Sequence, residues 1–198
     1  MSQDDLVGIV MAAGESSRFG TPKQLLPFGD TTLLGHVLRN ANRSTLDRVV
    51  VVLGREAPTV KDSFRHGSAV VVDNLSYGEG CASSLLAGLD EAGECAGIVL
   101  ILGDQPGVKT TTIDRVIGKW RSARNWASAT EYRGKLGHPL VFARGAFDHL
   151  RALHGDKAVW KLIEGYPDRV LRVEIDAEVP PDIDTPADYE AELARVYG

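Results

Sequence analysis

Short runs of valine, isoleucine and leucine alternate with helical patterns through the first half of the chain. The apolar runs lie at Leu6–Met11, Val49–Leu53, Ala69–Val72 and Ile98–Leu102. Helical periodicity falls between and after them, over Thr32–Asn42, Thr59–Phe64 and Ala82–Ala92. Because parallel strands need crossover connections and are buried on both faces, the alternation predicts a mainly parallel sheet covered by helices on both faces.

Beyond Asp104 the pattern is less regular. It predicts helices at 111–124, 145–153 and 157–163 and after Pro186, and strands at 126–130, 140–142 and 170–175. The chain has 198 residues, enough for one domain and short for two, and it shows no repeat or linker. We therefore predict one domain over residues 1–198, α/β in class, with a Rossmann-like three-layer α/β/α architecture. Ligands of such sheets bind beyond the carboxyl ends of the strands.

Charge and cysteine content narrow the function classes. The formal net charge is −5, which argues against binding to nucleic acid or to an anionic membrane surface. Two cysteines are too few for a disulfide framework, and the first residues lack a signal-peptide pattern. No apolar run approaches the length of a membrane span. We expect a cytoplasmic protein whose partners are small molecules or other proteins.

The first apolar run leads into a loop of small residues that carries two cations. The stretch from Gly8 to Pro27 reads GIVMAAGESSRFGTPKQLLP and contains Arg18 and Lys23. Small residues let backbone N–H groups approach an anion closely, so the pattern indicates a phosphate-binding loop. The spacing differs from that of a P-loop, because Lys23 follows Gly20 by three positions. A glycine-rich turn with two solvated cations is the alternative.

A carboxylate stands directly after the fourth apolar run, in Gly103-Asp104-Gln105-Pro106. A carboxylate at the tip of a buried parallel strand is well placed to bind a divalent cation that bridges phosphates. Asp104 is therefore our first candidate for a Mg²⁺ ligand. The alternative is that Asp104 caps the following helix.

A second acidic cluster occurs in the sequence DIDTP, at residues 182–186. Thr185 or Asp184 could cap a helix that has Pro186 in its first position. If the segment is extended, Asp182 and Asp184 point the same way, and one of them could complete a Mg²⁺ site with Asp104. We choose Asp184 for this role.

Two further segments could contact ligands. Ser83 and Ser84 follow a glycine-containing loop, and they could either cap a helix or offer hydroxyl groups to a nucleotide base. The spacing of Gly78 and Gly80 does not complete a dinucleotide-binding fingerprint, since position 83 is serine. His138, between turn-forming Gly137 and Pro139, could line an acceptor pocket, although a lone histidine is more often structural.

Taken in order, these segments resemble the MobA-like NTP transferases, within the nucleotide-diphosphosugar-transferase-like folds. The matching motifs are AAGESSRFGTPKQLLP at residues 12–27, N-x5-G-x3-S at 74–84, LGDQP at 102–106, GHP at 137–139, HGD at 154–156 and DIDTP at 182–186. Each motif is weak alone, but the ordered set is specific and spans nearly the whole chain.

Within that family the chain looks closest to molybdenum cofactor cytidylyltransferases. Relatives that use GTP typically read AGG where this chain has Ala12-Ala13-Gly14, so the resemblance favours CTP. It implies a nucleotide-binding half over about residues 1–106 and an acceptor-binding half over about 107–198. The implied nucleotide contacts are Ala12, Ala13, Gly14, Arg18, Lys23, Asn74, Gly80 and Ser84. Arg18, Lys23 and Asp104 are the implied catalytic residues, Asp104 and Asp184 the metal ligands, and His138 and Asp156 the acceptor contacts.

The implied activity is transfer of a nucleoside monophosphate to a phosphate of a molybdopterin-type acceptor, with Mg²⁺ as cofactor, pyrophosphate as second product and a molybdoenzyme as possible partner. One motif departs from the family, because Gly155–Trp160 lacks the second glycine and the arginine of a GDxGAR-like run. Two alternatives stay open at this stage: transfer to a sugar phosphate or another small acceptor, and a non-catalytic nucleotide or cofactor carrier.

Overall fold

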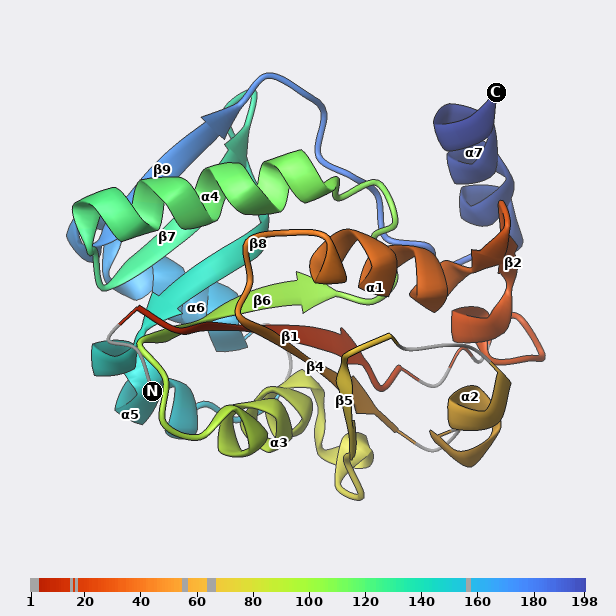
Figure 1. Ribbon diagram of the computed structural model, residues 1–198, viewed down its shortest axis with the longest axis horizontal. Helices are drawn as coiled ribbons and strands as arrows, with labels where there is room; N and C mark the ends of the chain where they lie inside the picture. Colours follow the sequence, from red (N-terminus) through yellow and green to blue (C-terminus); the bar gives the residue numbers. More distant parts are fainter. Residues whose placement is uncertain (1–3, 15, 17, 55–56, 64–66, 156–157) are drawn as a thin grey trace.

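The structure, a computed structural model, describes residues 4–198 apart from 15, 17, 55–56, 64–66 and 156–157. A seven-stranded sheet in the order β5-β4-β1-β6-β8-β7-β9 runs through its centre (Figure 1). The strands are β1 (Leu6–Ala12), β4 (Arg48–Leu53), β5 (Val70–Asp73), β6 (Gly97–Leu102), β7 (Ala127–Tyr132), β8 (Lys135–Ala143) and β9 (Val170–Ile175). All neighbouring pairs are parallel except those that β8 makes with β6 and β7. The predicted α/β class with a mainly parallel sheet is confirmed.

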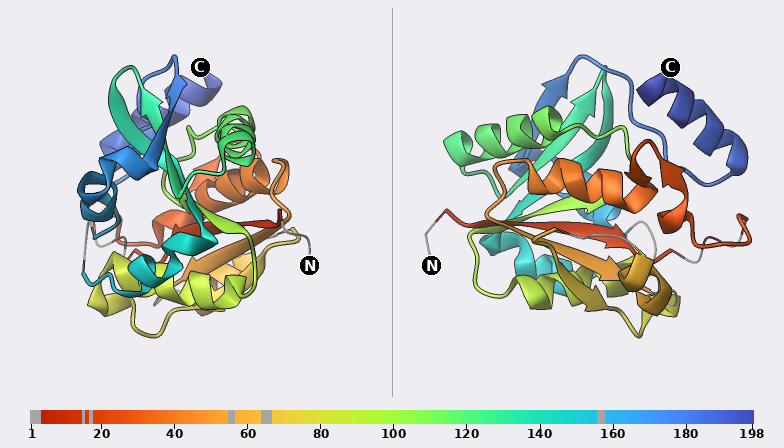
Figure 2. Two further views of the ribbon diagram at one scale, coloured as in Figure 1. Left: turned by 90° about the vertical axis from the view of Figure 1, so that its left-hand side faces the viewer. Right: turned by 45° about the vertical axis from the view of Figure 1, so that its right-hand side comes forward.

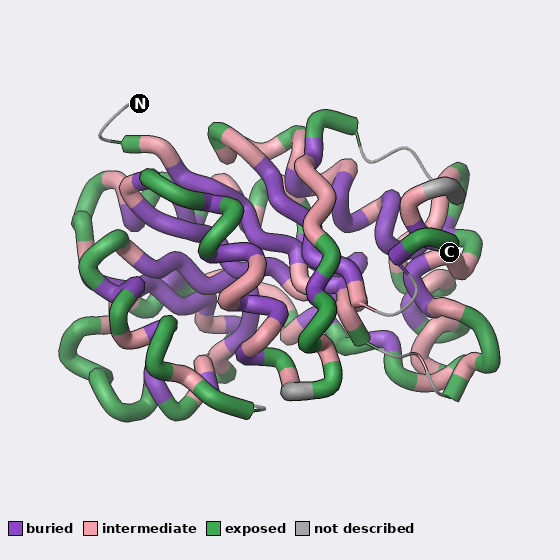
Figure 3. Tube along the Cα trace, turned by 90° about the horizontal axis from the view of Figure 1, so that it is seen from below, coloured by how far each residue is buried: buried purple, intermediate pink, exposed green. Residues whose placement is uncertain are grey.

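Helices cover both faces of the sheet (Figure 2). Alternate residues of the central strands pack against these opposite helix layers. Val49 and Val51 of β4 face the layer formed by α1 (Leu33–Asn42), α2 (Ala57–Ser63) and α4 (Thr110–Ala123). Val50 and Val52 face α3 (Cys81–Ala92), α5 (Phe147–Arg151) and α6 (Ala158–Gly165). The central strands β1, β4 and β6 are therefore buried on both faces, within the purple core in Figure 3, and this explains their continuous apolar character.

The Gly-His-Pro segment was predicted as a turn before a short strand, and this prediction is wrong. β8 begins at Lys135, and the segment lies inside it, after a tight connection through Arg133 and Gly134. The β7–β8 register shifts at Ala129/Thr130, so that His138 and Pro139 form a bulge, where a proline is tolerated in a sheet. Side-chain hydroxyls of Tyr132 and Thr130 donate to the carbonyls of His138 and Pro139, at 2.6 and 2.7 Å.

The C-terminal segment returns to the beginning of the chain. α7 (Pro186–Tyr197) packs on the small hairpin of β2 (Pro27–Phe28) and β3 (Thr31–Thr32) through a cluster that includes Phe28, Leu33 and Ile183. Thr185 caps α7 in a capping box with Asp188, and Pro186 takes the first position, as predicted. The short 3₁₀ turns are η1 (Lys23–Leu25), η2 (Tyr77–Glu79), η3 (Arg144–Ala146) and η4 (Pro167–Arg169).

None of the helices in the described part of the chain combines the length and the apolar character that a membrane crossing requires.

Residues 182–185, which precede α7, lie beside the end of β6. Ile183 N–H donates to the Asp104 carbonyl at 3.0 Å, so the acidic cluster is held beside the end of β6.

Candidate functional site

A cleft of about 600 Å³ lies at the carboxyl ends of the parallel strands. The loop after β1 contributes Ala13 and Gly14, and the start of α3 contributes Gly80 and Ser84. Asp104, Asp182 and Asp184 line it as well. Ala12 lies around a small adjoining cavity together with Lys23 and Asp104. The strand order thus brings most of the predicted nucleotide-binding residues to one edge of the sheet.

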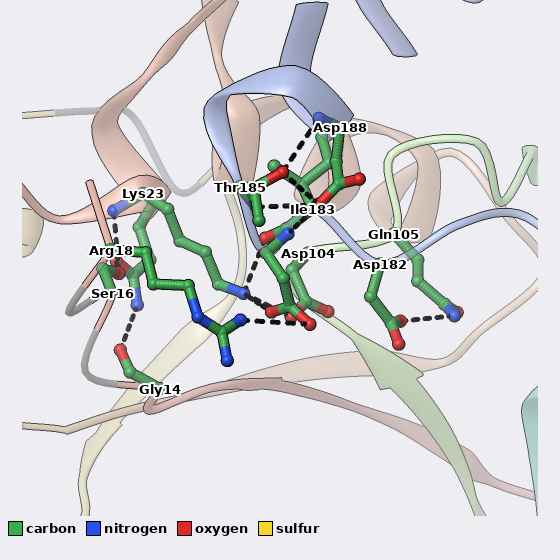
Figure 4. Close-up of polar contacts among 12 residues, drawn as sticks. Gly14, Ser16, Arg18, Lys23, Asp104, Gln105, Asp182, Ile183, Thr185 and Asp188 are labelled. Atoms are coloured by element: carbon green, nitrogen blue, oxygen red, sulfur yellow. Dashed lines mark hydrogen bonds and ion pairs between the residues drawn. The ribbon is translucent and has the colours of Figure 1, made fainter. Parts of the chain in front are cut away.

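Lys23 is the centre of the charged part of this cleft (Figure 4). Its ammonium Nζ donates to Asp104 Oδ2 at 2.7 Å, to the Ile183 carbonyl at 2.8 Å and to Asp184 Oδ1 at 3.1 Å. Lys23 is only 9% exposed. Burial opposes its charge, but the Asp104 and Asp184 carboxylates outweigh that effect and raise the pKa of Lys23 above its usual value. The ammonium therefore stays charged, and its three protons are all donated within the protein.

Arg18, the second predicted cation, has a different environment. Its side chain is 67% exposed, and its Nη1 lies 4.0 Å from Asp184 Oδ2, at the outer limit of an ion pair. Such an exposed pair contributes little stability. The guanidinium can therefore turn toward a ligand at little cost, whereas Lys23 must exchange an existing contact.

A buried glutamine that was not predicted links the end of β1 to the segment that carries Lys23. Gln24 is 5% exposed, and its Nε2 donates to the carbonyls of Ala12 at 2.8 Å and Gly14 at 3.1 Å. Ser16 Oγ donates to Gln24 Oε1 at 3.2 Å and accepts from the Lys23 N–H at 2.9 Å. Gln24 thus ties Ala12, Gly14 and Ser16 to the segment that carries Lys23. The only sequence signal was its position directly after Lys23.

Three carboxylates, those of Asp104, Asp182 and Asp184, lie in the cleft beside Lys23, and only Asp104 and Asp184 were predicted as metal ligands. Asp182 Oδ1 accepts from Gln105 Nε2 at 2.8 Å. Burial and the nearby charge of Asp104 raise the pKa of the Asp182 carboxyl. The capping alternative for Asp104 is wrong, since α4 begins at Thr110 and Lys109 is its N-cap residue.

Asp104 and Asp184 are suitable for a divalent cation. Among the described residues, no group of three or more His, Cys, Asp and Glu side chains is arranged to hold a metal ion alone. However, both carboxylates contact the same ammonium, so they already converge on one positive charge. Mg²⁺ is usually bound by one or two carboxylates together with substrate phosphates, and this pair fits that requirement.

The side-chain amide of Asn74 forms hydrogen bonds with both serines near the start of α3. Asn74 is 5% exposed, and its Nδ2 donates to Ser83 Oγ at 2.9 Å and to Ser84 Oγ at 3.0 Å. The capping alternative for both serines is wrong, because the N-cap residue of α3 is Gly80, without a side-chain cap. The buried Asn74 thus holds the hydroxyl of Ser84, which lines the cleft. Direct contact of either residue with a nucleotide stays a prediction.

His138, the predicted acceptor contact, lines a second cavity of about 250 Å³. This cavity shares Met11, Cys81, Leu102 and Asp182 with the larger cleft, so the two are continuous in their lining. Asp156, the other predicted acceptor contact, lies outside the described residues.

Comparison with known proteins adds to this geometry. A family model described as "MobA-like NTP transferase domain" matches residues 8–170. The solved structure of Rv0371C in complex with manganese, from Mycobacterium tuberculosis H37Rv, is 37% identical, with a TM-score of 0.82 and coverage of 96% of this chain and 98% of that chain.

Two relatives are named for different activities, one as an oxidoreductase and one as a cytidylyltransferase. Nicotine blue oxidoreductase of Paenarthrobacter nicotinovorans is 32% identical over 148 residues, which cover 71% of this chain and 72% of the relative. Molybdenum cofactor cytidylyltransferase of Escherichia coli K12 is 28% identical over 183 residues, which cover 91% of this chain and 92% of the relative.

Proposed function

Because the chain belongs to the MobA-like NTP transferase family, we propose that it transfers CMP from CTP to a phosphate group of a molybdopterin-type acceptor and releases pyrophosphate. One observation carries this proposal. The Lys23 ammonium lies between the Asp104 and Asp184 carboxylates, beside a cleft of about 600 Å³ that a glycine-containing loop borders. A cation, carboxylates that can hold a metal ion and a loop of small residues together suit the binding of a triphosphate.

The chain's own residues then have distinct roles. The reaction exchanges one phosphate for another at the α-phosphorus, so it needs alignment and charge stabilisation more than covalent help. Lys23 stabilises the charge that develops on the α-phosphoryl group, after it exchanges one of its three protein acceptors for a phosphate oxygen. Arg18, exposed and weakly paired, binds the departing pyrophosphate through its planar guanidinium. Asp104 and Asp184 would hold Mg²⁺, which neutralises phosphate charge when it is bound.

Several observations support the finer parts of the proposal. The loop reads Ala12-Ala13-Gly14, and the E. coli relative is named a cytidylyltransferase, which favours CTP. The solved relative with manganese supports a divalent cation, which we propose to be Mg²⁺ here. A nicotinamide or flavin reaction is disfavoured, because position 83 holds serine where the dinucleotide fingerprint needs its third glycine. A molybdoenzyme in the cytoplasm is the proposed recipient of the product.

Pyrophosphate release from each of the four NTPs, with Mg²⁺ and with or without a molybdopterin acceptor, tests the proposal. We expect release from CTP only when the acceptor is present, and its loss in Asp104→Asn. Asp90→Asn is the matched control, because Asp90 is exposed and pairs only with Arg151 at the surface of α3 among the described residues. Turnover of a sugar 1-phosphate without molybdopterin, or nucleotide binding without any release, would contradict the proposed reaction.

A further inference from the structure

β9 (Val170–Ile175) forms one edge of the sheet and has β7 as its only strand neighbour among the described residues (Figure 1). The backbone N–H and C=O groups along its outer side therefore face no partner strand in the described chain. Such an edge pairs readily with another extended chain unless the protein covers or blunts it. The side chains of the strand then decide which chain it accepts, because the backbone groups are the same in every strand.

The side chains of β9 alternate between the two faces of the sheet. Val173 is 2% exposed and belongs to the core cluster under α4, and Leu171 packs against the same cluster. Arg172 and Glu174 point to the opposite face, where both are exposed. There Glu174 lies directly beside Glu131 of β7, and like charges on neighbouring strands repel each other. Arg172 also contacts Glu131, at 3.2 Å, so one arginine stands with two glutamates on this face.

The order of residues in β9 makes the strand complementary to itself. Two copies of one strand that are related by a two-fold axis pair antiparallel, with the same surface on both sides. When Val173 lies on the axis, Arg172 of each copy faces Glu174 of the other. In the same register Leu171 faces Ile175, so apolar side chains meet on the other face. A pair centred on Arg172 or Glu174 would place like charges opposite each other, and a shift by one residue would exchange the faces.

The other edge of the sheet lacks such a pattern in the described chain. β5 (Val70–Asp73) has four residues and a single charged side chain. That side chain, Asp73, already forms an ion pair with Lys61 of α2, at 2.7 Å. Of these two described edges, only β9 therefore combines an exposed cation and an exposed anion in a self-complementary order.

We propose that β9 is a dimerisation edge: two copies of this chain join their sheets through antiparallel pairing of β9, centred on Val173. The pairing supplies backbone partners along the edge and brings an arginine to each Glu174 that lies beside Glu131. The two clefts then lie at opposite ends of the joined sheet, because antiparallel strands end on opposite sides. The described lining of the cleft includes no residue of β9, so this inference does not depend on the proposed function.

Sedimentation equilibrium of the intact protein over a range of concentrations measures the dimer directly. We expect the mass to rise from 21.4 kDa toward twice that value as the concentration increases. Arg172→Glu and Glu174→Arg should each raise the dimer Kd about tenfold or more, because two-fold symmetry makes two contacts repulsive at once. Arg151→Glu is the matched control, since Arg151 pairs with Asp90 at the surface and lies outside β9. This control should leave the dimer Kd unchanged.

A mixture of the two charge variants gives the sharpest test. In a heterodimer of Arg172→Glu with Glu174→Arg, both contacts join opposite charges again, so the mixture should dimerise about as tightly as the unchanged protein. The double variant with both substitutions should also recover the dimer, and circular dichroism verifies that each variant folds.

A protein that is monomeric at every concentration, or a dimer that both single variants leave unchanged, would overturn the proposal. A mixture that dimerises no better than the single variants would also overturn it, because the loss of dimer would then not result from the charge contacts.

Discussion

At the carboxyl ends of the strands, the larger cleft has three carboxylates with Lys23 and Arg18 beside them, whereas the described lining of the smaller cavity has apolar walls, Asp182 and a neutral imidazole. In the cleft, the buried cation is already bonded within the protein. In the cavity, the imidazole of His138 makes no hydrogen bond with a described residue, although its backbone carbonyl accepts from the Tyr132 hydroxyl.

The difference shows two ways to keep polar groups ready for a ligand. A buried charge needs compensation at all times, because an unpaired ammonium in a poorly hydrated place is very unfavourable. A neutral imidazole can stay unpaired at a smaller cost. On the proposed function, nucleotide binding in the cleft exchanges contacts of Lys23, whereas a ligand group that bonds to the His138 imidazole would add a contact.

Removal of the cation should produce the largest effect. Lys23→Ala should lower kcat for CMP transfer by on the order of 10²-fold or more, comparable to loss of an oxyanion donor in other enzymes. The assay is Mg²⁺-dependent pyrophosphate release with CTP and acceptor, and circular dichroism verifies the fold. Lys61→Ala is the control, because Lys61 forms an ion pair with Asp73 on the surface. Full turnover in Lys23→Ala would show that the cleft does not depend on this charge.

The neutral imidazole should appear in the pH dependence of stability. The pKa of His138 is about 4 in the folded protein and about 6.5 in the unfolded chain, so only the unfolded chain takes up this proton between those values. The stabilisation of the folded protein that results from the neutral His138 is fully present above pH 6.5 and is lost as the pH falls to 4. It amounts to about 3 kcal/mol of unfolding free energy, at roughly 1.4 kcal/mol per pH unit.

Urea unfolding of the unchanged protein and of His138→Gln, at pH 7 and pH 4, isolates this contribution. Glutamine does not titrate, so the variant should lose about 3 kcal/mol less over that interval than the unchanged protein. The same pH dependence in both proteins would mean that His138 titrates normally and that the cavity is wetter than its lining suggests.

A smaller effect should follow from loosening the loop of the cleft. Gln24→Leu leaves the carbonyls of Ala12 and Gly14 without their donor, and we expect the KM for CTP to rise about tenfold with a smaller change in kcat. Gln24→Glu keeps the shape of the side chain but also loses the donor, so it should behave like Gln24→Leu. If only the leucine variant is impaired, shape and not hydrogen bonding orders the loop.

The sequence was sufficient for features that depend on neighbouring residues. The strands at Leu6, Val49 and Ile98 were predicted because their buried runs are continuous, and the cap at Thr185 because Pro186 follows it. The same reliance on neighbouring residues made the prediction for the Gly-His-Pro segment wrong. Its glycine and proline are local turn signals, but pairing of β8 with β7 and two side-chain hydrogen bonds keep it inside the strand.

The site was predicted residue by residue but not as an assembly. Lys23, Asp104 and Asp184 were each selected, yet nothing local indicated that one ammonium would contact both carboxylates. Gln24 was missed because a polar residue in a polar loop gives no signal until its buried partners are known. The roles assigned to these residues in the reaction stay predictions until the variants are measured.

The contacts of Lys23 also have a consequence for the order of folding. They join residues 81, 160 and 161 positions apart, so the charged centre depends on contacts of very high sequence separation. Such contacts form late, because a long loop must close before they give any stability. During synthesis, the first half of the sheet can assemble while the lysine still lacks Asp184 and Ile183. Lys23 therefore gains Ile183 and Asp184 only when the C-terminal segment has packed beside the end of β6.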